Sequence, residues 1–313
     1  MSVERPNSPT PGIGWTCSDA MTARDAENLR RFNVVCLAWA MPLAGRVQGQ
    51  APLDLRVMSY NLRYASQKPP NDWPARRPIM KNLIAKAAPD VFGTQEGLYA
   101  QLKDIASDHP AYEWIGLGRD GGSRGEFMAI FYKRDRFEPM AYDHFWLSDT
   151  PEVIGSTTWG HSNRRMVTWV RFRERATGRE FMFWNTHLDH EVEAARQKAA
   201  ALIRDRLAAA DRAIPLILVG DFNCAAGNSR AFEILTAEAG LADTWALAAS
   251  RVNDGTNTFN GFQPAVKKGV RIDWVLLRGK ASVSRAEIVT YSEASQNPSD
   301  HFPVVVDLKL QGE

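Results

Sequence analysis

The sequence has little cysteine. Its 313 residues include three cysteines, Cys17, Cys36 and Cys224. The first two fall in an N-terminal segment that we expect to be cleaved or disordered, so the remaining domain holds one thiol and can form no internal disulfide. No cysteine–histidine cluster has the spacing of a zinc site. The chain is therefore neither a disulfide-stabilised scaffold nor a domain built around zinc.

The sequence also lacks a strong charge of either sign. Its 38 basic and 36 acidic residues leave a formal net charge of +2, with no block of lysine and arginine. Composition thus gives no sign of nucleic-acid binding, although a small phosphoester needs only a local positive pocket. The hydrophobic content of 44% is ordinary for a globular protein. One α/β domain of about 250 residues would use most of the chain.

The first 51 residues have the pattern of an export leader. A polar stretch and two arginines precede an apolar run over 32–45, which is followed by small residues. This order is typical of a secretory signal peptide, and the run is too short to span a membrane comfortably. The alternative is a disordered tail with a chance apolar patch. The pattern predicts a leader over 1–51, with Met21 as an alternative start, and an exported domain over 52–313. We expect that domain to be periplasmic or secreted, without a transmembrane anchor.

Beyond residue 52, short apolar strands are interspersed with helical stretches. Leu55 and Val57 share one face of the first predicted strand, and Met58 and Tyr60 share the other. Strands and helices mixed in this way indicate an α/β layered architecture. Strands are predicted over 55–63, 90–96, 126–133, 165–172, 180–188, 215–223, 270–278 and 301–310, and helices over 75–88, 98–107 and 191–210.

Polar side chains recur where these strands end, which is where α/β folds build active sites. Mg²⁺ prefers oxygen ligands, and Glu96, Asp300 and the amide oxygen of Asn61 are of that kind. Phosphoester hydrolysis also needs an activated water. Asp221 can take the proton of that water, and Asn223 points to the same side if the chain stays extended.

Cationic and hydrogen-donating groups are needed for the phosphoryl oxygens. His187, His301 and Arg165 are the candidates, each at or near a predicted strand end. A histidine works best when a carboxylate holds one of its ring nitrogens, and Asp273 is the candidate partner of His301. We expect Asp189 to cap the following helix, and His190 to be a surface residue.

Six short motifs mark the predicted strand ends: SYNLR (59–63), TQE (94–96), NTHLDH (185–190), GDFN (220–223), IDWVL (272–276) and SDHFPV (299–304). In these motifs and their order the chain resembles the endonuclease/exonuclease/phosphatase superfamily, which includes pancreatic-type deoxyribonucleases, inositol polyphosphate 5-phosphatases, neutral sphingomyelinases and deadenylases. One such motif has little specificity. Six in order extend from about residue 54 to residue 310.

The resemblance implies a four-layered α/β sandwich with two packed mixed sheets. It implies metal binding by Asn61 and Glu96, with Asp300 close by, and a water held and activated by Asp221 and Asn223. The ion would be Mg²⁺ or Mn²⁺.

The resemblance also implies roles for the two histidines. His301, paired with Asp273, would polarise the phosphate or transfer a proton, and His187 would act near the leaving oxygen. In some relatives the two histidines are themselves the acid and the base, so their individual roles stay open.

Further matches resemble a bacterial subgroup of metal-dependent hydrolases distantly related to deadenylases. FWLSDTPE (145–152), RMVTW (165–169) and TFNGF (258–262) carry this likeness, and Phe259 would stack on a base or sugar. The chain departs from the subgroup at Val192, where glycine is usual, and before Arg165, where proline is usual.

The sequence leaves the substrate open. We expect a monomeric phosphoester hydrolase of phosphodiesterase or nuclease type. A sugar- or lipid-phosphate phosphatase, a phospholipase C-like enzyme and a 3′–5′ exoribonuclease are alternatives. A binding protein without catalysis would have lost one of the acidic or histidine site residues, and none is replaced.

Overall fold

A computed structural model describes residues 51–267 and 269–312. Apart from its final residue, the predicted leader over 1–51 lies outside the described part of the chain. Among the helices that are described, none is long and apolar enough to cross a membrane.

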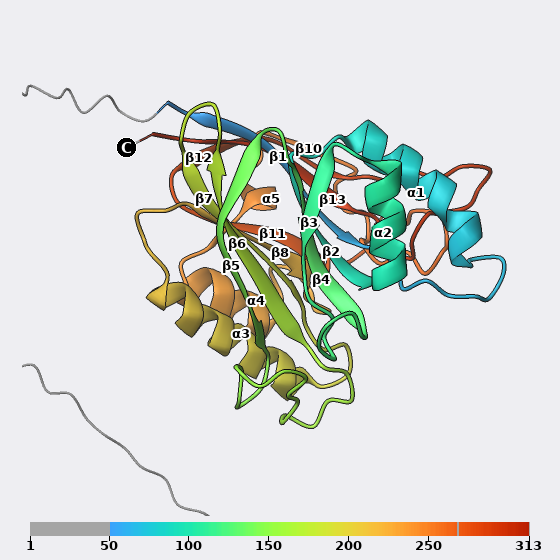
Figure 1. Ribbon diagram of the computed structural model, residues 1–313, viewed down its shortest axis with the longest axis horizontal. Coiled ribbons are helices and arrows are strands. Elements are labelled where there is room, and N and C mark those ends of the chain that lie inside the picture. The colour runs from blue at the N-terminus through green and yellow to red at the C-terminus, as the bar shows by residue number, and fades with distance from the viewer. Residues whose placement is uncertain (1–50, 268, 313) are drawn as a thin grey trace, which may run out of the picture. The chain divides into compact units, whose positions relative to one another are not determined.

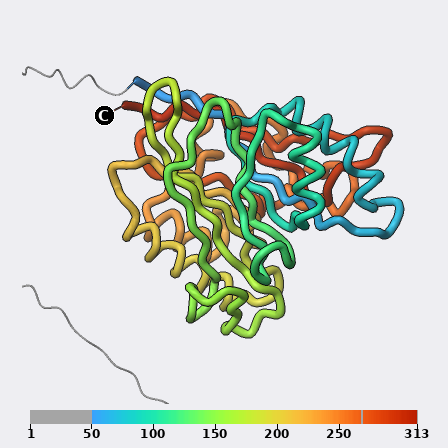
Figure 2. The backbone as a smooth tube through the Cα atoms, in the orientation of Figure 1, coloured from blue at the N-terminus to red at the C-terminus, as the bar shows by residue number. Residues whose placement is uncertain are grey.

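The first of two sheets is mixed and has seven strands in the order β10-β12-β13-β1-β2-β4-β3. Strand β1 lies near its centre, parallel to β2 and antiparallel to β13. Figure 2 shows these two distant segments of the chain, blue and red, running side by side. The strands are β1 (Leu53–Asn61), β2 (Val91–Leu98), β3 (Tyr112–Ile115), β4 (Glu126–Lys133), β10 (Ser250–Val252), β12 (Ala281–Ile288) and β13 (Val304–Leu310).

The second sheet is also mixed and has six strands in the order β5-β6-β7-β8-β11-β9. Strands β7 and β8 are parallel, whereas β11 runs antiparallel to β8. As predicted from its continuous apolar run, every residue of β8 is buried. The strands are β5 (Phe137–Trp146), β6 (Met166–Glu174), β7 (Glu180–His187), β8 (Leu216–Asp221), β9 (Ala242–Asp243) and β11 (Asp273–Arg278).

Helices pack on the outer face of each sheet, as Figure 1 shows. Helices α1 (Trp73–Ala87) and α2 (Tyr99–Asp108) pack on the first sheet. Helix α3 (Glu193–Ala209), the short helix α4 (Arg230–Glu233) and the π-helical turn η1 (Ile234–Glu238) pack on the second. Helix α5 (Thr244–Leu247) follows β9. The predicted layered sandwich is confirmed.

Side-chain alternation along β1 explains the layers. Leu55 and Val57 belong to the apolar cluster between the sheets, whereas Met58 and Tyr60 face the cluster under the helices. The prediction for this strand is therefore confirmed, because successive side chains of a strand point to opposite faces. Strands β5 and β12 were not predicted, since both carry several exposed or charged residues.

A small polar contact joins the sheets beneath their polar ends. Gln95 Nε2 donates to Asn185 Oδ1 at 2.7 Å, and Asn185 Nδ2 donates to the carbonyl of Thr94 at 2.8 Å. Gly93 allows this close approach, because a Cβ atom there would lie 2.5 Å from Cγ2 of Val219. The two sheets are thus held in fixed register near the strand ends that carry the polar side chains.

Arg76 of α1 holds together the loops that carry site residues. Its side chain is fully buried, and its guanidinium donates to the carbonyls of Leu62, Arg63, Tyr64 and Pro298. These carbonyls belong to the turn after β1 and to the segment before β13. One buried cation therefore fixes two chain segments beside each other.

Candidate active site

Strand ends from both sheets meet at one cluster. The first sheet supplies Asn61, Glu96 and the segment Asp300–His301. In the second sheet, Asp221 is the register partner of His187 on β7 and of Asp273 on β11. Because paired residues on neighbouring strands point to the same face, β8 places Asp221 between a histidine and a second carboxylate. The fold thus brings together side chains from segments far apart in the sequence.

Asp221 is the centre of this cluster and is buried. Its Oδ2 accepts from Asn61 Nδ2 at 2.9 Å and lies 3.4 Å from His187 Nε2 and 3.7 Å from His301 Nε2. Burial, followed by the neighbouring Asp273 carboxylate, raises the pKa of Asp221 above its usual range, and His301 opposes the shift. A buried carboxylate of this kind is a stronger base than an exposed one.

His301 is held by the expected partner. Its Nδ1 lies 2.9 Å from Oδ2 of Asp273, and both side chains are buried. Burial alone would lower the pKa of His301, but the carboxylates of Asp273 and Asp221 outweigh it and raise that pKa well above the ordinary value. The imidazole is therefore charged at neutral pH, with Nε2 directed toward Asp221.

The pKa of His187 is shifted in the opposite direction to that of His301. Burial lowers its pKa well below the ordinary value, and the charges of Arg165 and Arg119 lower it further. The amide nitrogen of Asn223 lies 3.0 Å from its Nε2, and the position of the single proton of the neutral ring depends on the tautomer. The site thus contains one charged and one neutral histidine, which is suited to acid–base chemistry.

The prediction that the chain from Asp221 to Asn223 stays extended is wrong. Asn223 has φ 51°, in the left-handed region, and its N–H donates to Asp221 Oδ1 at 3.0 Å. The chain turns here because the short side chain of Asp221 accepts this hydrogen bond, and asparagine tolerates the left-handed conformation. The Asn223 amide nevertheless reaches His187, and both residues belong to the cluster.

Glu96 projects from an irregular point of β2. The pairing of β2 with β4 shifts register between Thr94 and Gly97, and Glu96 has φ 62°. Such bulges redirect a side chain out of the ladder. The Glu96 carboxylate accepts from Asn61 Nδ2 at 3.1 Å and from the N–H of Tyr64 at 3.3 Å. The left-handed backbone at Glu96 is strain of the kind that concentrates at functional sites.

The carboxylates suit a divalent cation. Ligand atoms of Glu96, His187 and Asp221 lie within 4.8 Å of one another. Burial raises the pKa of Asp300, and the charge of Glu96 raises it further, so these two acids repel each other across the site. Buried, mutually repelling oxygen donors fit a hard cation such as Mg²⁺. Of the ligand set predicted from the sequence, the group above contains Glu96 alone, and Asn61 directs Nδ2 toward Glu96 and Asp221.

Arg165 is less accessible than a simple phosphate donor would be. Its side chain is only 4% exposed, with Nε 3.5 Å from Asp189 and Nη2 3.0 Å from His190 Nδ1. Its Nε has no hydrogen-bond partner in the described part of the protein. Asp189 accepts from the N–H groups of Glu191 and Val192 in the turn before α3. The prediction that it caps this helix is wrong, because the N-cap residue is Val192 and no side chain caps it.

Phe259 lies at the rim of the cluster. Its ring is 50% exposed and meets the His301 ring edge-on, with centroids 5.1 Å apart. The backbones of these two residues also form an isolated β-bridge. Phe259 is therefore placed to contact whatever group approaches His301.

Sequence reasoning missed three charged residues near the site. Arg119 and Glu126 form a pair at 2.6 Å, and both influence the pKa of Arg165. Arg63 contacts both Glu96 and Asp300. The position of Arg63 inside the SYNLR motif could have indicated that it lies near the site. The sequence does not show which carboxylates its side chain contacts.

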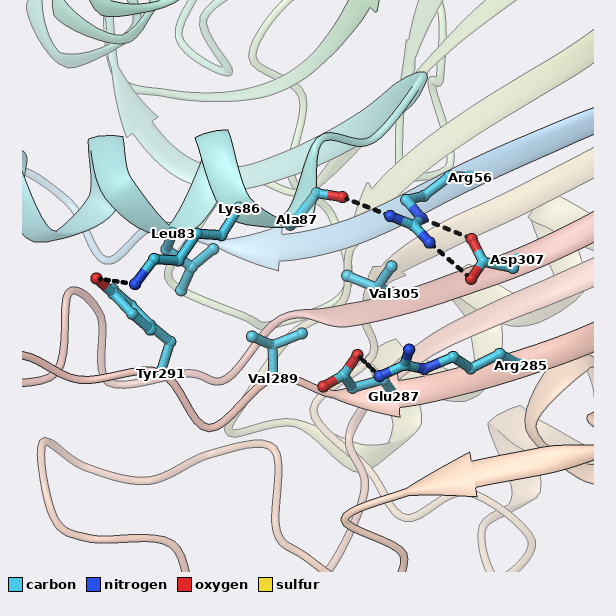
Figure 3. Close-up of a pocket in the computed structure, with 10 residues that line it drawn as sticks. All are labelled: Arg56, Leu83, Lys86, Ala87, Arg285, Glu287, Val289, Tyr291, Val305 and Asp307. Carbon is cyan, nitrogen blue, oxygen red and sulfur yellow. Dashed lines mark hydrogen bonds and ion pairs between the residues drawn. The ribbon is translucent and has the colours of Figure 1, made fainter.

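A separate cavity of about 270 Å³ lies between α1 and strands β12 and β13. Its charged side chains already have partners, as Figure 3 shows for Arg56 with Asp307, Arg285 with Glu287 and Lys86 with Tyr291. None of the predicted site residues lines this cavity. The cluster of site residues at the strand ends is therefore separate from this cavity.

Comparison with known proteins fits this geometry. Residues 58–301 match the sequence model of the Endonuclease/Exonuclease/phosphatase family. This span contains every candidate site residue. The chain belongs to this family. The endonuclease/exonuclease/phosphatase fold accounts for the two packed sheets, and family members hydrolyse phosphoesters.

Similar solved structures come from Bacteroides thetaiotaomicron. One, described as an endonuclease/exonuclease/phosphatase family protein, is 34% identical with a TM-score of 0.79 and covers 84% of this chain and 97% of its own. Another, a mannosyl-6-phosphatase, is 34% identical with a TM-score of 0.76 and covers 81% of this chain and 99% of its own. A protein of Acanthamoeba polyphaga mimivirus is 30% identical over 161 residues, which are 48% of this chain and 59% of the viral protein.

Proposed function

We propose that this protein is a divalent-cation-dependent hydrolase that removes phosphate from a phosphorylated sugar. The observation that carries the hydrolytic part is the position of Asp221, whose carboxylate lies within 3.4 Å of His187 and 3.7 Å of the charged His301. The carboxylate of Asp221, the neutral imidazole of His187 and the charged imidazole of His301 therefore lie next to one another. That arrangement suits in-line attack by water on phosphorus.

Each residue has a defined part in the proposed reaction. Asp221 takes a proton from the attacking water, and the Asn223 amide, fixed against His187 at 3.0 Å, orients that water. His301, kept charged by Asp273, donates to the phosphoryl oxygens or to the leaving oxygen. A Mg²⁺ or Mn²⁺ ion held by Glu96, Asp300 and Asn61 would neutralise negative charge on the phosphate.

Two observations support a sugar phosphate as the substrate. The mannosyl-6-phosphatase shares 34% identity with this chain across nearly all of its own length. The net charge of +2, without a basic block, lacks the electrostatic footprint of proteins that bind long nucleic acids. Both favour a small phosphomonoester over the phosphodiesterase or nuclease activity first expected.

A nucleotide phosphodiester is the second candidate, and the exposed ring of Phe259 beside His301 favours it. An aromatic ring at that position could stack on a base as well as on a sugar face. A 3′–5′ exoribonuclease, one of the alternatives left open by the sequence, could use the same contact to hold a base. The lipid-phosphate alternative has no comparable support among the described residues.

A substrate panel tests these proposals. We would assay mannose 6-phosphate, glucose 6-phosphate, bis-p-nitrophenyl phosphate, an RNA oligonucleotide and sphingomyelin, each with Mg²⁺ and with EDTA. The proposal expects chelator-sensitive release of phosphate from a sugar phosphate and its loss in Asp221→Asn. Turnover of RNA alone would select the second candidate. No chelator-sensitive turnover of any substrate by a folded protein would indicate a binding protein instead.

We further propose that the protein is exported. The basis is the sequence pattern of residues 1–51, and an exported enzyme would meet sugar phosphates outside the cytoplasm. N-terminal sequencing of the protein from its native host checks this. A mature terminus near residue 50 is expected, whereas an intact residue 1 or 21 would contradict export.

A further inference from the structure

The side chain of Arg63 lies across the two acids expected to hold the cation. Its Nη1 is 3.7 Å from Glu96 Oε2, and its Nε is 3.5 Å from Asp300 Oδ2. Both carboxylates are largely shielded from solvent, at 15% and 9% exposure, while Arg63 is 35% exposed. A single accessible guanidinium therefore neutralises a pair of shielded carboxylates.

The backbone fixes this position. Arg63 has φ 53°, and its N–H donates to Asn61 Oδ1 at 2.9 Å. The next N–H, that of Tyr64, donates to Glu96 at 3.3 Å. Arg76 binds the carbonyls of both turn residues from below. The left-handed turn thus aims the guanidinium at the same oxygens that the cation needs, and the guanidinium also lies 4.3 Å from the Tyr64 ring.

We propose that Arg63 competes with the divalent cation and thereby sets the metal affinity of the site. In the metal-free protein its guanidinium neutralises Glu96 and Asp300, and it withdraws from between them when the cation binds. Two positive groups cannot share these carboxylates without strong repulsion. The inference rests on the proposed function, because it takes the cation to be held by Glu96 and Asp300.

The direct test is the dissociation constant of Mg²⁺, measured by titration calorimetry on the metal-stripped full chain. Arg63→Gln removes the charge and tolerates the turn, so the dissociation constant should fall on the order of ten-fold. Arg63→Lys keeps the charge and should stay close to the wild type. Arg77→Gln is the matched control, because Arg77 is also 35% exposed and also bridges two carboxylates, Asp104 and Asp108. It should leave the dissociation constant unchanged.

A second readout separates competition from a merely structural role. In EDTA, Arg63→Gln should melt at a lower temperature than the wild type, because Glu96 and Asp300 lose their neutralising partner. In saturating Mg²⁺ the difference should close, because the cation replaces the guanidinium. An equal loss of melting temperature in both conditions would show that Arg63 supports the turn alone, and would overturn the proposal.

The outcomes distinguish this inference from the function on which it rests. If wild type binds Mg²⁺ and Glu96→Gln weakens that binding, an unchanged or higher dissociation constant in Arg63→Gln refutes the inference alone. If wild type binds neither Mg²⁺ nor Mn²⁺, the inference fails together with the proposed metal dependence. Should Arg63→Gln not fold, Arg63→Met provides the same loss of charge.

Discussion

Nδ1 of His301 lies 2.9 Å from Oδ2 of Asp273, although His301 precedes a strand of the first sheet and Asp273 begins a strand of the second. This carboxylate keeps the imidazole charged and fixes which nitrogen faces Asp221. We expect Asp273→Asn to lower kcat by about 10²–10⁴-fold, because the side chain keeps its size but loses the charge that stabilises the imidazolium.

Steady-state kinetics on the best substrate of the panel measure this effect. The matched control is Asp54→Asn, which changes an exposed carboxylate of β1 and should leave kcat unaltered. Circular dichroism establishes that each variant is folded. A folded Asp273→Asn protein with wild-type kcat would remove the pair from the mechanism.

Glu96 is expected to act through the cation. Glu96→Gln removes the charge while the amide can still accept from Asn61 or Tyr64. The Mg²⁺ dissociation constant should therefore rise by at least about ten-fold. Calorimetric titration measures it, and Glu113→Gln on β3, which pairs with Tyr132, is the control. Equal Mg²⁺ affinity in Glu96→Gln and wild type would place the cation on other ligands.

Gly93 is expected to permit the close packing of the two sheets. An added Cβ would lie 2.5 Å from Val219 and 2.7 Å from Asn185, whose amide is fixed by hydrogen bonds. Gly93→Ala should lower the free energy of unfolding by about 1–3 kcal/mol, measured by urea denaturation. Gly97→Ala should cost less, because the nearest atom there is the movable end of Leu102. The reverse ranking would contradict this account of the interface.

His161 is expected to make stability depend on pH. Burial lowers its pKa below the ordinary value, with Arg165 adding to the effect and Asp189 opposing it. The unfolded chain therefore binds the proton more readily than the folded one. The stability is fully present above about pH 6.5, the pKa of an unperturbed histidine, and is lost as the pH falls below it.

Urea denaturation between pH 7.5 and pH 5.5 checks this dependence. His161→Leu should show a shallower loss of stability over that interval than the wild type. Some slope should remain, because burial also lowers the pKa of His187, His109 and His144. Parallel slopes for variant and wild type would mean that His161 takes up its proton as easily folded as unfolded.

The strands and their faces could be predicted because their cause is local. The alternation of Leu55 and Val57 with Met58 and Tyr60 has the period of a strand, and the structure places the pairs in separate clusters as expected. Strand β12 escaped prediction because Arg285 and Glu287 interrupt its apolar pattern. Its place beside β13 is set by tertiary pairing.

The site could be predicted as a set of residues but not as a geometry. Motif order indicated Asp221 and His301, whereas the register that puts Asp221 opposite both His187 and Asp273 depends on pairing between distant strands. The left-handed turn at Asn223 could not be predicted from the sequence either, since the same residues could have continued the strand. The partners of Arg63 follow from the tertiary fold.

The meeting of the two sheets at the candidate site has a consequence for the folding of the chain. Asn61 and His301 flank strands that pair with each other, yet they are separated by most of the domain. The candidate site is therefore complete only when the most distant segments of the domain have joined and both sheets have closed. A chain whose C-terminal segment has not yet paired with β1 would lack His301 at this cluster.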